Sequence, residues 1–112
     1  TWGFVTNSPL IMTIKMTKIR QSARGQTCIR CGAPPDTVRA CHYNGIRQHF
    51  YGKGRGIKAS DLMTAELCAA CDEIYSEGTT QGFESRVDRS ESFLHLVCLT
   101  NIRRLERGII KV

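Results

Sequence analysis

The chain has 112 residues, of which 41% are hydrophobic. This length suffices for one folded domain, and this composition is typical of a globular protein rather than a disordered one. No run of about 18 apolar residues occurs, so a membrane-spanning helix is not expected. Residues 1–15 lack the basic start and apolar stretch of a signal peptide. We interpret them as an upstream extension or an expression remnant that precedes a single domain over residues 16–112.

The formal net charge of +6 is unevenly distributed along the chain. Residues 15–58 contain ten Lys or Arg and one acid, a net +9, whereas residues 59–112 contain six basic and nine acidic residues, a net −3. Such a concentration of positive charge is typical of a protein that binds a polyanion, most often nucleic acid. A solvated basic face that only keeps the protein in solution fits the charge equally well.

The first expected elements are short. Residues 18–27 are polar and basic, which predicts a turn or a short helix. The string CIRCGAPP over residues 28–35 has the form of a zinc knuckle, because Gly32 can adopt a positive φ and the two prolines stop a helix. Strand character follows around Val38. A wide glycine-rich loop comes next, and a short helix is expected to begin inside the second cysteine pair and to end at Gly78.

A longer helix is expected near the C-terminus. Ser90 is a good N-cap residue for a helix over residues 91–107. Four apolar residues recur there at helical spacing and predict one stripe that faces the core: Leu94, Cys98, Ile102 and Leu105. Cys98 is therefore predicted to be a core residue. His95 lies off this stripe and is more simply a surface residue than a ligand.

Four of the six cysteines form two Cys-x-x-Cys pairs separated by 36 residues: Cys28, Cys31, Cys68 and Cys71. Three disulfides would be expected in a secreted chain, but without a secretion signal we expect a cytoplasmic protein with reduced thiols. Zinc prefers four soft donors in a tetrahedron, and each pair supplies two. We therefore predict a closed, structural zinc site. The order of knuckle, hairpin and helix is that of a treble-clef zinc finger, which gives a small α+β fold with an additional C-terminal helix.

Further candidate catalytic residues lie between the two cysteine pairs or directly after the second pair. His42 and Asn44 follow the first expected strand, Asp61 follows the glycine-rich loop, and Asp72 comes directly after Cys71. If the strand with His42 packs beside the second zinc helix, His42 and Asp72 can face one cleft. A histidine with carboxylates suits a divalent ion such as magnesium or manganese and an activated water.

The loop reads GKGRGIK, with glycine at alternate positions. Lys53, Arg55 and Lys58 are candidate contacts to a nucleic-acid backbone, since glycine allows close approach to phosphates. Arg20 and Arg24 are further candidates in the basic half. The spacing is neither that of a nucleotide P-loop nor that of a dinucleotide fingerprint. A solvent-exposed hairpin tip remains the alternative for the loop alone.

From about Ile19 to the C-terminus, the sequence resembles the HNH-type nucleases, and more closely a small phage and prophage group that includes the YbcO-like and Ref-like proteins. The strings that carry the resemblance are SARGQTC, CHYN followed by GKGRGIKASD, CAAC and LERGII. The resemblance implies a ββα core, DNA as the partner, and a divalent cation at the catalytic centre. It implies that His42 is the general base. It places Asp61 at the middle polar position that orients the histidine, with Asn44 as a nearby candidate.

The sequence departs from this family on the helix. Relatives carry CHxEIDxG, whereas this chain has CDEIYSEG, so that Asp72 replaces the metal-binding histidine and Ser76 replaces the aspartate. Aspartate can still bind Mg²⁺ or Mn²⁺, and Glu73 or His49 could compensate. Two hypotheses follow: a metal-dependent DNA endonuclease of phage recombination or DNA processing, or a degenerate, zinc-stapled module that binds nucleic acid without cleaving it.

Overall fold

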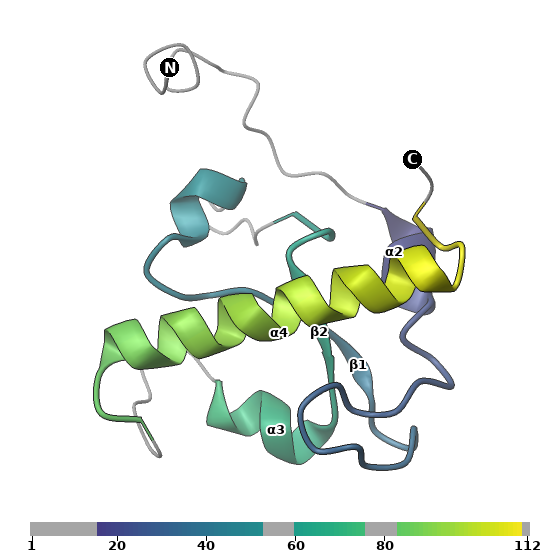
Figure 1. Cartoon of the computed structure of the whole chain (residues 1–112), viewed down its shortest axis with the longest axis horizontal. Helices are drawn as coiled ribbons and strands as arrows, with labels where there is room; N and C mark the ends of the chain where they lie inside the picture. Colours follow the sequence, from purple (N-terminus) through teal and green to yellow (C-terminus); the bar gives the residue numbers. More distant parts are fainter. Residues whose placement is uncertain (1–15, 53–59, 76–82, 111–112) are drawn as a thin grey trace, which may run out of the picture.

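The structure is a computed structural model that describes residues 16–52, 60–75 and 83–110. Its elements, in chain order, are α2 (Thr17–Gln21), β1 (Arg39–His42), the 3-10 helix η1 (Gln48–Tyr51), β2 (Thr64–Leu67), α3 (Ala69–Ile74) and α4 (Arg86–Glu106). Figure 1 shows α4 crossing the front of the molecule, with the two strands behind it, α3 below and α2 near the C-terminal end of α4. Within these ranges, no helix has the length and apolar character that crossing a membrane requires.

The centre of the fold is a two-stranded antiparallel sheet. Arg39 pairs with Leu67 at one end of the sheet, and His42 pairs with Thr64 at the other. Strand β1 begins directly after Val38, and α3 begins at Ala69, between the two cysteines of the second pair, as the sequence predicts. The α+β class and the order of knuckle, hairpin and helix are therefore confirmed. The predicted helix end at Gly78 lies outside the described residues.

Helix α4 begins earlier than the sequence analysis predicts. Its N-cap is Ser85, whose Oγ accepts a hydrogen bond from the Asp88 amide at 3.1 Å. Ser90, the predicted cap, is instead buried inside the helix, where its Oγ lies against the Tyr43 hydroxyl. The signal that identifies the true start is a serine followed three residues later by an acid, a spacing that Ser85 and Asp88 have and Ser90 lacks.

The apolar stripe predicted to face the core points mainly outward. Leu94 is partly buried and packs against the core, as predicted, whereas Cys98 is exposed and Ile102 and Leu105 are 54% and 44% exposed. The buried face of α4 consists of Arg89, Ser90, Phe93, Leu96, Val97, Thr100 and Arg104. The prediction that Cys98 is a core residue is therefore wrong.

Polar residues can occupy the buried face of α4 because the hairpin supplies their partners. The Thr100 Oγ1 accepts a hydrogen bond from the Glu66 amide at 3.2 Å. Arg104 is fully buried and donates to the Thr64 Oγ1 at 2.7 Å and to the Asn101 Oδ1 at 2.8 Å. A pattern search for apolar residues alone misses this face, since buried polar groups are acceptable when they are hydrogen-bonded.

An aromatic cluster fills the space between the sheet, α3 and α4. The Phe93 ring lies 5.5 Å from the Tyr43 ring and 5.0 Å from the Tyr75 ring, measured between centroids. Gly45 allows this packing, because a Cβ at that position would clash with the Tyr43 and Ser90 side chains. Aromatic pairs at such distances contribute about 1 kcal/mol beyond the area that they bury.

A buried carboxylate joins the sheet to the C-terminal part of α4. Glu66 on β2 is fully buried and accepts hydrogen bonds from Arg103 at 2.6 Å and from Arg107 at 3.3 Å. The same two arginines also donate to the backbone carbonyls of Thr27 at 2.8 Å and of Ser22 at 2.7 Å. The charge of Glu66 therefore holds the C-terminal part of α4 against the segment that leads into the first cysteine pair.

We predict that Glu66→Gln lowers the free energy of unfolding by about 2–3 kcal/mol, because it leaves two arginines without their buried counter-charge. We expect a value at or below the low end of the range for breaking a buried ion pair, because the Arg103 and Arg107 side chains are not fully buried. They are 21% and 22% exposed. Urea denaturation measures the change. The exposed Glu84→Gln is the control and should leave the midpoint unchanged; equal effects of the two variants would contradict this role of Glu66.

Candidate metal centre and adjacent histidine site

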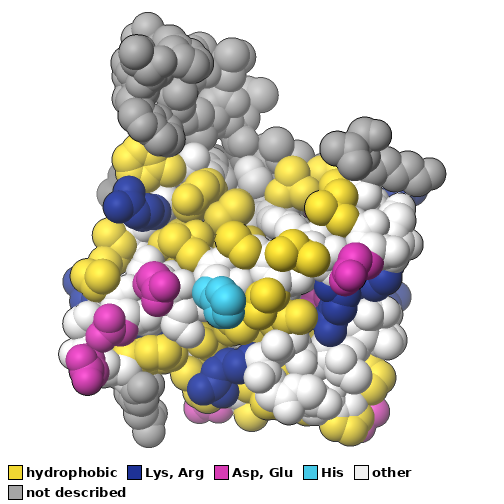
Figure 2. All heavy atoms as spheres, viewed as in Figure 1, with side chains coloured by type: hydrophobic (Ala, Val, Ile, Leu, Met, Phe, Trp, Pro, Cys, Tyr) yellow, Lys and Arg dark blue, Asp and Glu magenta, His cyan; other side chains and the backbone are white. Residues whose placement is uncertain are grey.

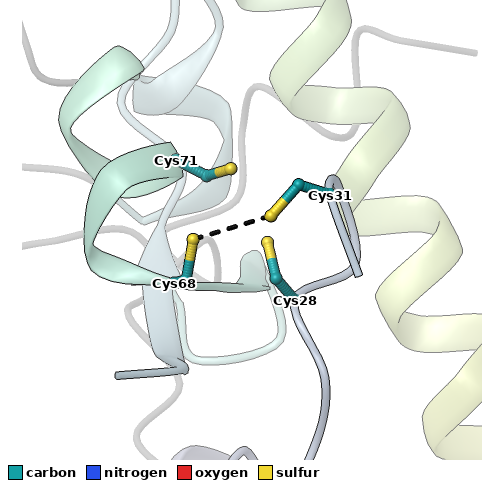
Figure 3. Close-up of side chains that lie close together, drawn as sticks. All are labelled: Cys28, Cys31, Cys68 and Cys71. Carbon is teal, nitrogen blue, oxygen red and sulfur yellow. Dashed lines mark hydrogen bonds between the residues drawn. The ribbon is translucent and has the colours of Figure 1, made fainter. Parts of the chain in front are cut away.

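The four paired cysteines converge on one point. Figure 3 shows the side chains of Cys28, Cys31, Cys68 and Cys71 directed toward one another from the knuckle and from α3. Their sulfur atoms all lie within 4.8 Å of one another, and those of Cys31 and Cys68 are 3.8 Å apart. A zinc tetrathiolate with bonds of about 2.3 Å has sulfur–sulfur distances of about 3.8 Å. The cluster could therefore hold a metal ion, and its donor set and spacing are compatible with zinc.

Local backbone geometry produces this convergence. In the knuckle, the Gly32 amide donates to the Cys28 carbonyl at 2.9 Å, and Gly32 adopts the positive φ of 76° that the sequence analysis expects. The Ile29 amide donates to the Glu66 carbonyl at 2.8 Å, which docks the knuckle on β2. Cys68 is the N-cap residue of α3, and Cys71 therefore lies in the first turn of that helix.

Two thiols in this cluster, those of Cys28 and Cys71, have strongly perturbed pKa values. Burial acts to raise the pKa of Cys28, but backbone amides of Cys31, Cys68 and Arg30 and the Cys31 thiol outweigh it and lower that pKa to about 6. Burial and the three neighbouring thiols raise the pKa of Cys71 to about 12, although Arg30 donates to its sulfur at 3.5 Å. Four crowded thiols do not all ionise unaided, and a bound cation favours their deprotonation.

A second cluster lies on the other face of β1. The His42 Nε2 lies 2.7 Å from the Asp61 Oδ1, and the Asp61 Oδ2 accepts hydrogen bonds from the Arg20 Nε at 3.1 Å and from the Met16 amide. The Asp61 side chain is 5% exposed, whereas that of His42 is 18% exposed. The structure thus brings together three residues that the sequence analysis singled out for different reasons: His42, Asp61 and Arg20.

Asp61 remains ionised at neutral pH. Burial acts to raise the pKa of its carboxyl, but hydrogen bonds from His42 and the Met16 amide and the charge of Arg20 outweigh it and hold the pKa below the ordinary value of 3.8. An ionised carboxylate only accepts hydrogen bonds, so the His42 Nε2 carries the proton in this pair. Among the described residues, no side chain or backbone group forms a hydrogen bond with the His42 Nδ1, which carries a lone pair in the neutral imidazole.

A basic groove adjoins this cluster. It has a volume of about 340 Å³, lies between α2 and β1, and is lined by Thr17, Arg20, Gln21, Ala23, Arg24, Val38, Arg39 and Ala40. Arg20 connects the two features, because it lines the groove and also donates to Asp61. The candidate nucleic-acid contacts Arg20 and Arg24 therefore lie together.

Asp72 does not join His42. Its carboxylate accepts a hydrogen bond from Arg39 at 2.7 Å. Burial, together with the nearby charge of Asp72, raises the pKa of the Cys41 thiol to about 12. Arg39 and Cys41 share one face of β1, and His42 points to the opposite face, since side chains alternate along a strand. The predicted cleft with Asp72 opposite His42 is therefore not the arrangement found here. The Cys41 side chain is buried on the face of β1 opposite His42.

Asn44 also has a different role from the one predicted. Its Nδ2 donates to the Tyr75 carbonyl at 3.0 Å, and its Oδ1 accepts from the buried Arg89 at 2.9 Å. Asn44 therefore links the end of α3 to α4 rather than orienting His42. Two residues that could compensate for Asp72, His49 on η1 and Glu73 on α3, are exposed.

Other candidates are not placed by the structure. Lys53, Arg55, Lys58 and Ser76 lie outside the described residues. His95 is exposed on α4, in agreement with its interpretation as a surface residue. Buried Arg89 and Glu66 were missed at the sequence level, because nothing in their local pattern distinguishes them from the exposed charges nearby.

The chain is similar to a solved structure from Escherichia coli K-12, strain MG1655, that is described as a bacteriophage protein. The two are 25% identical, the TM-score is 0.56, and the match covers 81% of this chain and 100% of the E. coli chain. No family model matches the sequence, and no curated protein matches it.

We predict that the metal centre is essential for folding. Cys71→Ser should lose most of a stability of about 5–10 kcal/mol, because the energy of metal binding is also folding energy. Cys98→Ser is the matched control, since Cys98 is exposed and away from the cluster. Elemental analysis and thermal unfolding test this together. A Cys71→Ser protein that melts like the wild type would contradict it.

We also predict an acid-sensitive contribution from Asp61. Because its folded pKa is depressed, the stability it contributes is present above the unfolded pKa near 3.8 and is lost as the pH falls through the lower, folded value. Asp61→Asn should therefore have a clearly lower free energy of unfolding than the wild type at pH 7, and the two free energies should become equal below about pH 3. Urea unfolding at several pH values measures this. Asp36→Asn, at an exposed position, is the control. A stability difference between the wild type and Asp61→Asn that does not become smaller in acid would contradict this role of Asp61.

Proposed function

We propose that this chain is a zinc-stapled endonuclease that hydrolyses phosphodiester bonds in DNA. The observation that carries this proposal is the His42–Asp61 pair, with its ionised carboxylate and its available ring nitrogen, next to a groove lined by arginines. If His42 had only a structural role, it would not need to lie next to a groove lined by arginines.

In this proposal, the ion at the four cysteines is zinc, and the knuckle, hairpin and α3 form a treble-clef unit. Four thiolate ligands leave no open coordination position, so this zinc would hold the fold and take no part in the reaction. Its contribution to function is indirect. It fixes the strands between the two cysteine pairs, and one of those strands carries His42.

His42 would act as the general base. With its Nε2 proton held by Asp61, the Nδ1 lone pair can accept a proton from a water molecule, which attacks phosphorus as it loses that proton. The bond from phosphorus to the 3′ oxygen breaks, and that oxygen leaves and takes up a proton from solvent. Asp61 fixes the tautomer and the ring orientation, as a carboxylate does behind a catalytic histidine.

The basic groove would hold the phosphate backbone. Arg20, Arg24 and Arg39 provide fixed positive charge along it, and guanidinium groups match phosphate geometry well. Lys53, Arg55 and Lys58, which belong to the same basic half of the sequence, remain predicted contacts to the phosphate backbone. Charge of this kind positions nucleic acid without selecting a base sequence.

The family resemblance also leads to the expectation of a catalytic magnesium or manganese ion. The described residues do not fit the arrangement predicted for it, because Asp72 pairs with Arg39 on the other face of β1. The cysteine cluster is the one group of three or more potential ligands that these residues assemble. We therefore assign no step to such an ion, and a requirement for it remains a prediction.

The similar E. coli structure, which is described as a bacteriophage protein, supports a phage or prophage origin for this chain. We accordingly place its proposed action in the bacterial cytoplasm, in phage DNA recombination or processing. The alternative is a module that binds DNA without cleaving it. The pairing of Asp72 with Arg39 favours that alternative, since it removes the ligand that was expected to replace the family histidine.

We predict that His42→Ala abolishes nicking of supercoiled plasmid DNA, a loss of at least about 100-fold, and leaves DNA binding unchanged. His95→Ala is the matched control, because His95 is an exposed histidine on α4. Both proteins should be assayed with Mg²⁺, with Mn²⁺ and with EDTA. Nicking that survives in His42→Ala would contradict the proposal.

The Asp72→His variant distinguishes the endonuclease hypothesis from the hypothesis of a module that binds DNA without cleaving it. If the wild type binds DNA but never cleaves it with any divalent ion, while Asp72→His does cleave it, the chain is a binding module derived from a nuclease. If the wild type cleaves, the enzyme hypothesis holds. If it neither binds nor cleaves DNA, both hypotheses are wrong.

A further inference from the structure

The segment that leads into η1 exposes two large hydrophobic side chains next to cationic ones. Ile46 is 51% exposed and Phe50 is 55% exposed. Arg47 and His49, which lie between them in the sequence, are exposed as well. Figure 2, in the same view as Figure 1, shows hydrophobic and basic side chains next to one another at the upper left, where Figure 1 shows η1. One short segment therefore presents both apolar and cationic groups to solvent.

The backbone of this segment is fixed to the core of the protein. The Ile46 amide donates to the Oγ of buried Ser90 at 3.1 Å, and the Arg47 amide donates to the hydroxyl of buried Tyr43 at 3.1 Å. The Tyr51 ring packs against the Tyr43 ring, with 5.7 Å between their centroids. The exposed side chains therefore project from a fixed segment, and a ligand that binds them does not have to order that segment first.

The same segment is connected to the proposed reaction centre. The Ser60 amide donates to the carbonyl of Tyr51, the last residue of η1, at 2.8 Å. The next residue, Asp61, contacts His42 through one carboxylate oxygen and Arg20 of α2 through the other. Figure 1 shows η1 at the upper left and α2 at the right of the molecule. A polymer that lies in the groove beside α2 and passes His42 can therefore extend to η1.

The charge around this segment indicates the kind of ligand. Residues 37–60 contain five Lys or Arg and no Asp or Glu. A nucleic acid supplies both a phosphate for a cationic side chain and a flat base for an aromatic ring, and bases stack on aromatic side chains of any binding groove with little regard to sequence. In a duplex, each base already stacks on its neighbours. An unpaired base is therefore the ligand that fits an exposed ring next to an arginine.

We propose that Phe50 stacks on an unpaired nucleobase and that Arg47 contacts a phosphate of the same strand. Ile46 would give an apolar contact beside the stacked base. This inference rests on the proposed binding of DNA, and it names the form of DNA that the chain prefers, namely a single-stranded or locally unpaired segment.

The fluorescence of 2-aminopurine in a single strand of about 12 nucleotides, a length within the usual site size, tests the stacking directly. No divalent ion is added to the zinc-loaded chain, so that cleavage does not interfere. The wild type should quench the fluorescence, because the base stacks on the Phe50 ring. Phe50→Trp should keep the quenching. Phe50→Ala and Phe50→Leu should lose it, since neither side chain has a ring.

Binding measurements on the same strand test the size of the effect. Phe50→Ala should weaken binding by about 5- to 100-fold. Ile102→Ala, which shortens an equally exposed apolar side chain on α4, is the matched control and should leave the affinity unchanged. Arg47→Gln should reduce the slope of log affinity against log salt concentration by about 0.7, whereas Phe50→Ala should leave that slope unchanged. A fully paired duplex should bind equally well to the wild type and to Phe50→Ala.

The outcomes separate this inference from the proposed function. Because Phe50 is exposed, its variants should unfold at the same temperature as the wild type. Unquenched fluorescence with the wild type, or a Phe50→Leu variant that binds like the wild type, would overturn the stacking and would not bear on nicking by His42. A wild type that binds no DNA would overturn both the stacking and the proposed function.

Discussion

The four-cysteine cluster is the constraint on which the rest of the structure depends. It joins two segments separated by 36 residues, the knuckle and the start of α3, and the hairpin is the chain that connects them. With both ends of the hairpin fixed, strands of only four residues each can hold a register. Such short strands are marginal alone, and a domain of this size gains much of its rigidity from a metal.

The two faces of β1 then acquire different chemistry. One face carries Cys41 and Arg39, which contact or influence Asp72 on α3. The other face carries His42, which meets Asp61 and, through it, α2. The same alternation that buries Cys41 leaves the ring of His42 partly exposed next to a basic groove. Helix α4 covers the sheet on one side and exposes Ile102 and Leu105 on the other.

The parts that sequence analysis predicted correctly are those with a short-range cause. The Cys-x-x-Cys spacing, the positive φ of Gly32 and the start of α3 inside the second pair all depend on a few neighbouring residues. The class of the fold follows from their order. The contacts of Asp72 could not be predicted in this way, because Arg39, more than thirty residues earlier, competes for its carboxylate.

Periodicity placed Leu94 correctly against the core, but Cys98, Ile102 and Leu105, predicted on the same buried face of α4, are exposed. The buried face contains Thr100 and Arg104, whose burial depends on Thr64 and Glu66 in the hairpin, and no helical pattern reveals those partners. Likewise, the importance of Ser85 as a cap appears only when the acid three residues later is considered. Local pattern thus locates an apolar surface, whereas tertiary contacts decide what covers it.

We propose that His42, held by Asp61, presents its Nδ1 to a nucleic acid lying in the arginine groove. Imidazole ¹⁵N NMR of the zinc-loaded protein, titrated with a short DNA duplex, tests it most directly. We predict that His42 is in the Nε2–H tautomer and that its ring signals and the Arg20 and Arg24 side-chain signals shift on addition of DNA. A His42 in the Nδ1–H tautomer, or signals that do not respond to DNA while other parts of the protein do, would contradict the claim.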